Sequence, residues 1–221
     1  MVDPKAYKQG DVINSNMTPG DPKGLPDESL NSTLANKRVI VLIDGSNFYH
    51  STAKRGKKID FGVFINALVG DRELVRAYYY VAPLDIESNE DKYWSHQRFL
   101  DKLRKVSKLE VVLCSLKKVK TSKGDIYLVK GDDVKMSNHL IMGAVDNLYD
   151  VAIVVSGDED FIDSVKIVRE RYGKKVENAF FSRSSSLNLR NSCDSIINLN
   201  NFIDKMEVKK SSALSEDHAE H

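Results

Sequence analysis

The sequence predicts an α/β fold with three layers, in which a central, mostly parallel five-stranded sheet lies between helices on both faces. Apolar runs of strand length alternate along the chain with segments of helical periodicity that contain ten residues or more. Helical connections of this length join parallel strands and cover the faces of the sheet. With 221 residues, of which 41% are hydrophobic, the chain can bury one core of this kind.

The first strand is predicted at residues 38–44, RVIVLID, where the apolar residues are continuous and several are β-branched. Such a run is typical of a strand that is buried on both faces. Four further apolar runs complete the predicted sheet, at residues 73–82, 109–116, 151–156 and 175–182.

Helices are predicted at residues 60–70, 89–108, 133–150 and 160–173, with a short helix and a terminal extension at 186–199. The helical period of the second segment puts Trp94, Phe99 and Leu103 on the side that faces the core. Gly173 is expected to end the fourth helix, because glycine readily adopts the left-handed conformation found there.

The two ends of the chain differ in composition from its centre. Residues 1–36 contain four of the five prolines and few large apolar side chains, so we predict a disordered N-terminal arm. Residues 209–221 are polar and are predicted to form a disordered tail. The folded domain is therefore expected at residues 37–208.

Charge and cysteine content exclude several classes of protein. The net charge is only +1, so any attraction to nucleic acid must come from a local basic surface. Cys114 and Cys193 are widely separated, which does not suggest a disulfide framework. No apolar run approaches the ~20 residues that cross a bilayer. We expect a cytoplasmic protein without a membrane partner.

Acidic residues follow the predicted strands at the points where they end. Asp44 ends the first strand, and Ser46 follows it on the next turn. Asp158 and Asp160 come directly after the fourth strand, in VVSGDED. A further acidic pair, Asp132 and Asp133, begins a predicted helix. Ligands of open α/β sheets bind at the carboxyl ends of the strands, so we expect these carboxylates to lie close together.

Carboxylates that share one pocket repel one another unless a cation lies between them. Hard divalent cations such as Mg²⁺ or Mn²⁺ prefer carboxylate and water oxygens. A site of this kind suits the attack of water on a phosphodiester. Each acid alone is equally typical of a helix N-cap, but three such positions at one predicted edge favour a metal site.

Other α/β chemistries lack their motifs. The turn after the first strand has no GxGxxG, and the chain contains no GxxxxGK[ST]. GxSxG and HExxH are also absent.

Four segments together resemble the NYN domains of the PIN-like superfamily, specifically the LabA-like group. In order they are VIVLIDGSNFYH, VKGDDVKM, YDVAIVVSGDEDFIDSVKIVRERYGKKV and SSSLNLRNSCDSIINL, within about residues 37–204. The resemblance implies a PIN-like α/β/α fold and metal-dependent ribonuclease activity. It also implies catalytic, metal-holding roles for Asp44, Asp133, Asp158 and Asp160, with polar support from Asn47 and Ser156.

One position departs from the pattern of the LabA-like group. Members commonly carry a further acid six positions after the residue that matches Asp133, and His139 stands there in this chain. His139 either serves as a neutral ligand or proton carrier, or is a partly buried helix histidine, and the last interpretation is the more common one. The neighbouring Asp132 would restore the missing negative charge.

Basic residues surround the predicted acidic edge. Residues 115–133 are predicted to form a β-hairpin or an extended loop that leads to the acids. The cations expected to contact RNA are Lys117, Lys118, Lys120, Lys123, Lys130, Arg183 and Arg190. Lysine runs are often only solvated, but this position favours sequence-tolerant binding of single-stranded RNA.

The sequence therefore predicts a Mg²⁺- or Mn²⁺-dependent endoribonuclease. Two other functions stay open: a catalytically weak RNA-binding or regulatory module, and a nuclease or phosphatase that acts on DNA. The sequence is compatible with a homo-oligomer but does not specify one.

Overall fold

The computed structural model describes residues 36–52, 59–86, 89–121 and 124–203. Six parallel strands form one sheet in the order β3-β2-β1-β6-β7-β8. They are β1 (Arg38–Asp44), β2 (Glu73–Val81), β3 (Leu109–Leu113), β6 (Val151–Val155), β7 (Lys175–Phe180) and β8 (Ser195–Asn198). The predicted parallel sheet is confirmed, with one strand more than expected.

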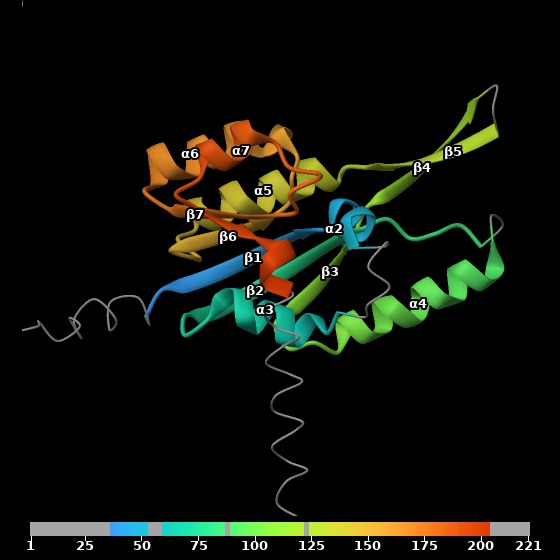
Figure 1. Cartoon of the computed structure of the whole chain (residues 1–221), viewed down its shortest axis with the longest axis horizontal. Helices are drawn as coiled ribbons and strands as arrows, with labels where there is room; N and C mark the ends of the chain where they lie inside the picture. Colours follow the sequence, from blue (N-terminus) through green and yellow to red (C-terminus); the bar gives the residue numbers. More distant parts are fainter. Residues whose placement is uncertain (1–35, 53–58, 87–88, 122–123, 204–221) are drawn as a thin grey trace, which may run out of the picture.

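Helices cover both faces of this sheet, as the three-layer prediction requires. One layer contains α3 (Phe61–Val69) and α4 (Glu90–Arg104), and the opposite layer contains α5 (Asp132–Val145), α6 (Ile162–Tyr172) and α7 (Leu187–Ser192) (Figure 1). A short helix, α2 (Gly45–Thr52), follows β1 directly, and the 3-10 helix η2 (Glu159–Phe161) precedes α6. Gly173 ends α6 with φ 62°, as predicted.

The central strand β1 is buried on both sides, which explains its uninterrupted apolar sequence. Val41 and Ile43 pack into the cluster under α3 and α4. Ile40 and Leu42 pack into the cluster under α5 and α6. All four side chains are 0% exposed, so the alternation of a strand delivers apolar groups to both cores.

The order of the strands creates a switch point between β1 and β6. From β1 the chain builds outward through β2 and β3, then returns to the other side of β1 and continues through β6, β7 and β8. The connections on the two sides of this point therefore diverge, which leaves room at the carboxyl ends of β1 and β6. Asp44 ends β1, and Asp158 follows β6.

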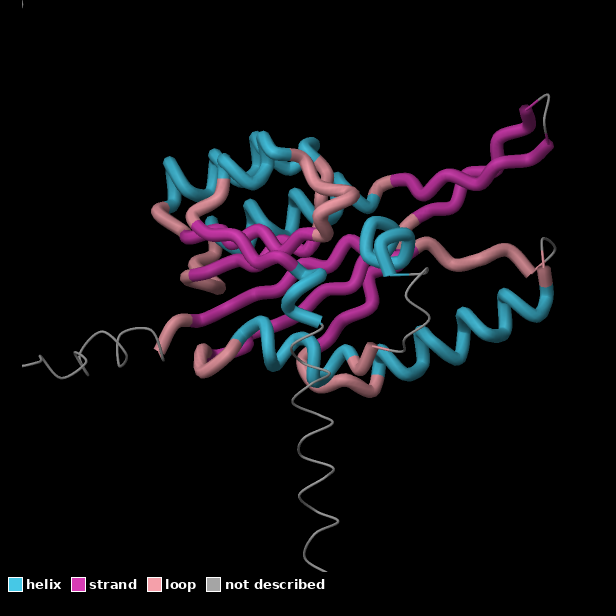
Figure 2. The backbone as a smooth tube through the Cα atoms, viewed as in Figure 1, coloured by secondary structure: helices cyan, strands magenta, loops and turns pink. Residues whose placement is uncertain are grey.

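A two-stranded antiparallel hairpin is separate from the main sheet. It consists of β4 (Ser115–Thr121) and β5 (Gly124–Lys130). Figure 2 shows it extending away from the body of the molecule. The predicted hairpin is confirmed. Its turn was expected at residues 123–125, but Gly124 and Asp125 already belong to β5, and the connecting residues 122–123 lie outside the described residues.

Three sequence-based predictions were wrong in detail. The segment predicted as a terminal extension contains β8, a strand of only four residues, and the predicted turn after Asp44 is the helix α2. Trp94, expected in the core, is 49% exposed, whereas Leu103 further along the same helix is buried. The reason is that the N-terminal part of α4 extends past the end of the sheet (Figure 1), so the sheet cannot cover it.

The predicted arm at residues 1–36 and the predicted tail at 209–221 lie almost wholly outside the described residues. Within the described part of the chain, no helix combines the length and apolar character that a bilayer crossing requires.

Candidate functional site

A cavity of about 430 Å³ opens at the carboxyl ends of β1 and β6. Four carboxylates line it, from Asp44, Asp132, Asp133 and Asp158. They come from three separate parts of the chain: the end of β1, the start of α5 and the turn after β6. The structure therefore brings together four of the five acids that the sequence singled out.

Asp44 is the deepest of these acids, with 7% of its surface exposed. One carboxylate oxygen accepts a hydrogen bond from the backbone N–H of Asn47 at 2.9 Å, and the other accepts one from the Ser156 hydroxyl at 2.9 Å. Burial raises the pKa of Asp44, and the negative charges of Asp132 and Asp158 raise it further, while the two hydrogen bonds oppose the shift.

A buried asparagine supports the turn from Ser156 to Asp158. Asn178, on β7, is 0% exposed, and its amide nitrogen donates to the carbonyl oxygens of Val154 and Ser156 at 3.1 and 2.9 Å. The Ser156 hydroxyl oxygen in turn accepts from the backbone N–H of Asp158 at 3.1 Å. This chain of bonds links the position of Asp158 to that of Asp44.

Gly157 lies where two backbone segments approach each other closely. A Cβ at this position would lie 1.5 Å from the carbonyl oxygen of Ser184, which no side chain could tolerate. The backbone N–H of Ser186 donates to the Gly157 carbonyl at 2.8 Å. The segment around Ser184 is therefore fixed against the acidic turn.

Asp158 has two roles at once. Its carboxylate lines the cavity and also accepts from the backbone N–H of Asp160 at 3.1 Å, which makes it the N-cap of η2. Asp160 itself is exposed and does not line the cavity. Its charge still contributes to raising the pKa of Asp133, so it lies near the other acids.

Asp133 lies in the first turn of α5, next to Asp132. Its pKa is raised to about 6, first by burial and then by the charges of Asp132, Asp158, Asp44 and Asp160. The acids therefore repel one another, as the sequence suggested. A bound cation would relieve this repulsion.

The donor set fits a hard divalent cation in its chemistry, because it consists of carboxylate, hydroxyl and amide oxygens. In the described part of the chain, however, no three His, Cys, Asp or Glu side chains lie close enough to surround one ion. The acids line a cavity rather than a single point, so binding would require their side chains to converge.

His139 lies outside the acidic cavity. Its Nδ1 is 2.8 Å from the hydroxyl of Tyr80, and its ring is 4.5 Å from that of Tyr78. The pKa of His139 is lowered, chiefly by burial. It does not line the cavity, and its environment is that of a half-buried helix histidine.

The cavity also contains residues that the sequence did not point to. Besides Ser46 and Asn47, its polar wall includes His50 from α2 and Ser184, whose hydroxyl is 2.7 Å from that of Ser51. His50 is one helical turn after Ser46, so it would have been found had α2 been predicted. The base of the hairpin forms the opposite wall, through residues 127–129.

The predicted cations are distributed over two regions. Lys117, Lys118 and Lys130 are exposed on the hairpin, and the Lys118 ammonium lies 5.8 Å from the ring of Tyr127. The side chain of Lys120 and the whole of Lys123 lie outside the described residues.

Two predicted arginines lie beyond β7. Arg183 is exposed on the segment that approaches Gly157. The Arg190 guanidinium lies over the ring of Phe180, 4.7 Å from its centre, and is half-buried. Arg190 is thus engaged in packing against β7.

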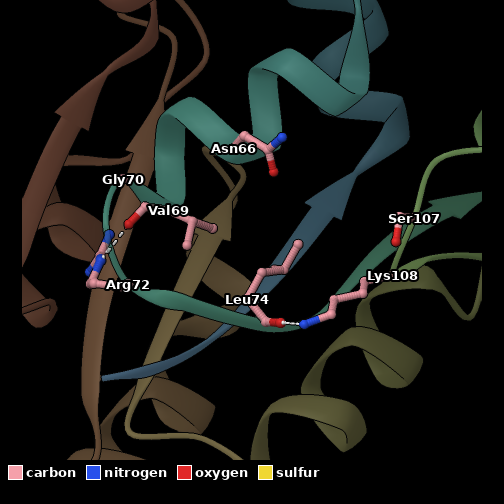
Figure 3. A pocket seen from close by; sticks show the side chains of 7 residues that line it. All are labelled: Asn66, Val69, Gly70, Arg72, Leu74, Ser107 and Lys108. Atoms are coloured by element: carbon pink, nitrogen blue, oxygen red, sulfur yellow. Dashed lines mark hydrogen bonds between the residues drawn. The ribbon is translucent and has the colours of Figure 1, made fainter. Parts of the chain in front are cut away.

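A second concavity of about 430 Å³ lies at the opposite end of the sheet (Figure 3). Its two cations already have partners. Arg72 pairs with Glu177 and donates to the carbonyl of Val69, and Lys108 donates to the carbonyl of Leu74. Because these charges are satisfied within the protein, the acidic cavity is the stronger candidate site.

Comparisons with known proteins bear on the family and the fold of this chain. The NYN domain family matches residues 38–200, which include all the acids discussed above. The chain is also similar to the crystal structure of a protein of unknown function from Vibrio parahaemolyticus, with 26% identity and a TM-score of 0.59. That similarity covers 76% of this chain and 96% of the Vibrio protein. No curated protein sequence matches. Since the family match extends over most of its length, the chain belongs to the NYN domain family.

Proposed function

We propose that this protein is a Mg²⁺- or Mn²⁺-dependent endoribonuclease that hydrolyses phosphodiester bonds of single-stranded RNA at the acidic cavity. NYN proteins are generally nucleases, and nucleases of this kind typically use divalent metals. The observation that carries the proposal is the meeting of four carboxylates at the switch point of the sheet.

Asp44, Asp133 and Asp158, which line the cavity, would hold the cation. Asp160, which is exposed outside the cavity, would join them only if its side chain turned inward. The cation would stabilise negative charge on the phosphate and make a water molecule more acidic. The protein's own contribution is orientation. The bonds from Asn47 and Ser156 fix both oxygens of Asp44, so its carboxylate does not need to reorganise when a cation binds.

The surroundings of the cavity favour a single strand of RNA. Exposed lysines on the hairpin, Lys117 and Lys130 among them, provide phosphate contacts next to the acids. Tyr127 and Leu128 line the same cavity, and Leu128 is 40% exposed, which gives an unpaired base an apolar surface.

A second candidate function is RNA binding without efficient cleavage. It is supported by the spacing of the acids, which in the described residues does not surround a metal ion, and by His139 in place of a further acid. A nuclease or phosphatase acting on DNA is the third alternative, because the acidic cavity alone does not select the sugar.

The test is cleavage of end-labelled single-stranded RNA and of DNA with the same sequence, with Mn²⁺, Mg²⁺ or EDTA. We expect metal-dependent cleavage of RNA and little cleavage of DNA. Asp158→Asn should abolish cleavage without unfolding the protein, because asparagine caps a helix as well as aspartate does. Asp163→Asn, an exposed acid on α6 outside the cavity, is the matched control and should retain activity.

The other outcomes separate the alternatives. Equal cleavage of DNA would indicate the DNA-directed enzyme. RNA binding without cleavage under any metal condition would indicate the regulatory module.

A further inference from the structure

The chain has a single tryptophan, and its position is unusual. Trp94 lies on α4 and is 49% exposed, although burying an indole ring is strongly favourable. Two more apolar side chains are exposed in the segment that leads to α4, Leu84 at 37% and Ile86 at 47%. Exposed apolar side chains that lie close together often mark a surface that a partner covers.

The surface faces the same end of the molecule as the acidic cavity. The segment before α4 leaves the carboxyl end of β2, and β2 lies next to β1, which carries Asp44. Figures 1 and 2 show the N-terminal part of α4 and the hairpin extending from this same end, with α2 between them. A bound polymer can therefore extend from the cavity toward the hairpin or toward the N-terminal part of α4.

The side of α4 that carries Trp94 also carries cations that could contact phosphates. Arg98 and Lys102 are exposed on the same side of α4 as Trp94 and form no ion pair with any described residue, whereas Lys92, two positions before Trp94, lies on the other side of the helix. Arg98 follows Trp94 by four positions, so the two side chains are neighbours on the helix. Acids lie here too: Asp101 pairs with Arg104, Glu90 accepts from the Trp94 indole at 3.3 Å, and Asp91 is exposed in the first turn of α4.

An exposed aromatic ring beside cations is the combination that binds single-stranded nucleic acid: the ring stacks on a base and the cations contact phosphates. We propose that Trp94, with Arg98 and Lys102, forms a second contact surface for the single-stranded RNA whose scissile phosphate lies in the acidic cavity. The inference rests on the proposed function, because it assigns the same RNA to both places.

Intrinsic fluorescence tests this surface directly, because Trp94 is the only indole in the protein. The Asp158→Asn protein in EDTA is titrated with a 12-nucleotide single-stranded RNA that it does not cut. We expect saturable quenching of the emission, since stacking on a base quenches an indole. Absence of quenching while labelled RNA binds by anisotropy would overturn the proposal.

Substitutions measure the contribution of the ring. Trp94→Ala should weaken binding of the 12-nucleotide RNA about tenfold, within the range for one stacked base. Trp94→Phe should restore most of the affinity, because phenylalanine keeps an aromatic face; if the indole N–H bond to Glu90 were what mattered, Trp94→Phe would bind as weakly as Trp94→Ala. Tyr172→Ala removes a ring that is 37% exposed at the far end of α6 and should leave affinity unchanged. Equal affinity of the wild-type and Trp94→Ala proteins would overturn the proposal.

Cleavage assays separate this inference from the proposed function. If RNA quenches Trp94 but is never cut, the surface stands and the nuclease assignment fails. If RNA is cut but neither quenching nor a rise in KM for Trp94→Ala is seen, the nuclease stands and the surface is refuted.

Discussion

Replacing Asp133 by asparagine should stabilise the metal-free protein at neutral pH. The pKa of Asp133 is raised to about 6, from an unperturbed value near 4, by burial and by the surrounding carboxylates. A shift of about two units corresponds to roughly 3 kcal/mol at most. Because the carboxylate is partly exposed, solvent screening reduces this to about 1–2 kcal/mol.

A second contribution opposes this gain. Asp133 lies in the first turn of α5, where a negative charge interacts favourably with the helix dipole by about 0.5 kcal/mol. The net stabilisation expected for Asp133→Asn is therefore about 1 kcal/mol. For a domain of this size it corresponds to a rise in Tm of about 2–4 °C.

The pH dependence of this stabilisation shows whether it comes from the ionisation of Asp133. The folded protein binds the Asp133 proton more tightly than the unfolded chain does, so ionisation of this carboxyl destabilises the fold. The penalty is absent below about pH 4, develops between pH 4 and 6, and is complete above about pH 6. The advantage of Asp133→Asn should follow the same course.

The assay is urea or thermal unfolding in EDTA at pH 4 and pH 7. Asp163→Asn is the control, since it also removes an acid from the first turn of a helix but lies outside the cavity. It should lose a few tenths of a kcal/mol. With millimolar Mn²⁺ the order should reverse, because wild type binds the cation more tightly. If Asp133→Asn destabilises the protein at pH 7, or if its effect is the same at both pH values, the repulsion argument is wrong.

Three further predictions concern other parts of the molecule. Gly157→Ala should destabilise the protein by about 1–3 kcal/mol in urea unfolding, because the new Cβ would lie 1.5 Å from a backbone oxygen; an unchanged midpoint would contradict the close approach. Changing both Lys117 and Lys118 to glutamine should lower the slope of log K against log salt for RNA binding by about 1.4, while the metal-induced rise in Tm stays the same; an unchanged slope would make these lysines bystanders. Although burial alone would raise the pKa of Asp194, the bonds it accepts, chiefly from Arg169, lower it to about 2, so Asp194→Asn should cost about 1–2 kcal/mol at pH 7 and progressively less below pH 4.

The main sheet could be predicted because its strands are encoded locally. A strand buried on both faces needs an uninterrupted apolar run, and β1 and β6 have one. The short edge strand β8 could not be found in this way, because two of its four residues are exposed and its pairing with β7 depends on tertiary contacts. The exposure of Trp94 was missed for a similar reason: the period of α4 fixes its faces but not how far the sheet extends beneath it.

The acids of the site could be predicted because parallel strands bring their carboxyl ends to one edge. His50 and Ser184 could not, since the first depends on the helical course of α2 and the second on a segment that folds back from beyond β7. The distances between the acids could not be predicted either, because spacing along the chain does not give the separation of side chains that come from three different elements.

The position of Asp158 depends on a residue that carries no charge. Asn178 lies in the middle of β7 and is fully buried, where an unpaired amide group would cost about 1–3 kcal/mol. A leucine or valine there would pack without that cost. The asparagine instead donates to two carbonyls of the segment that leads to the acidic turn. On the alternation of β7, Asn178 stands between the buried apolar residues Val176 and Phe180. A polar residue at that position was therefore a sequence signal of the site, and it marked the support of the turn rather than a ligand.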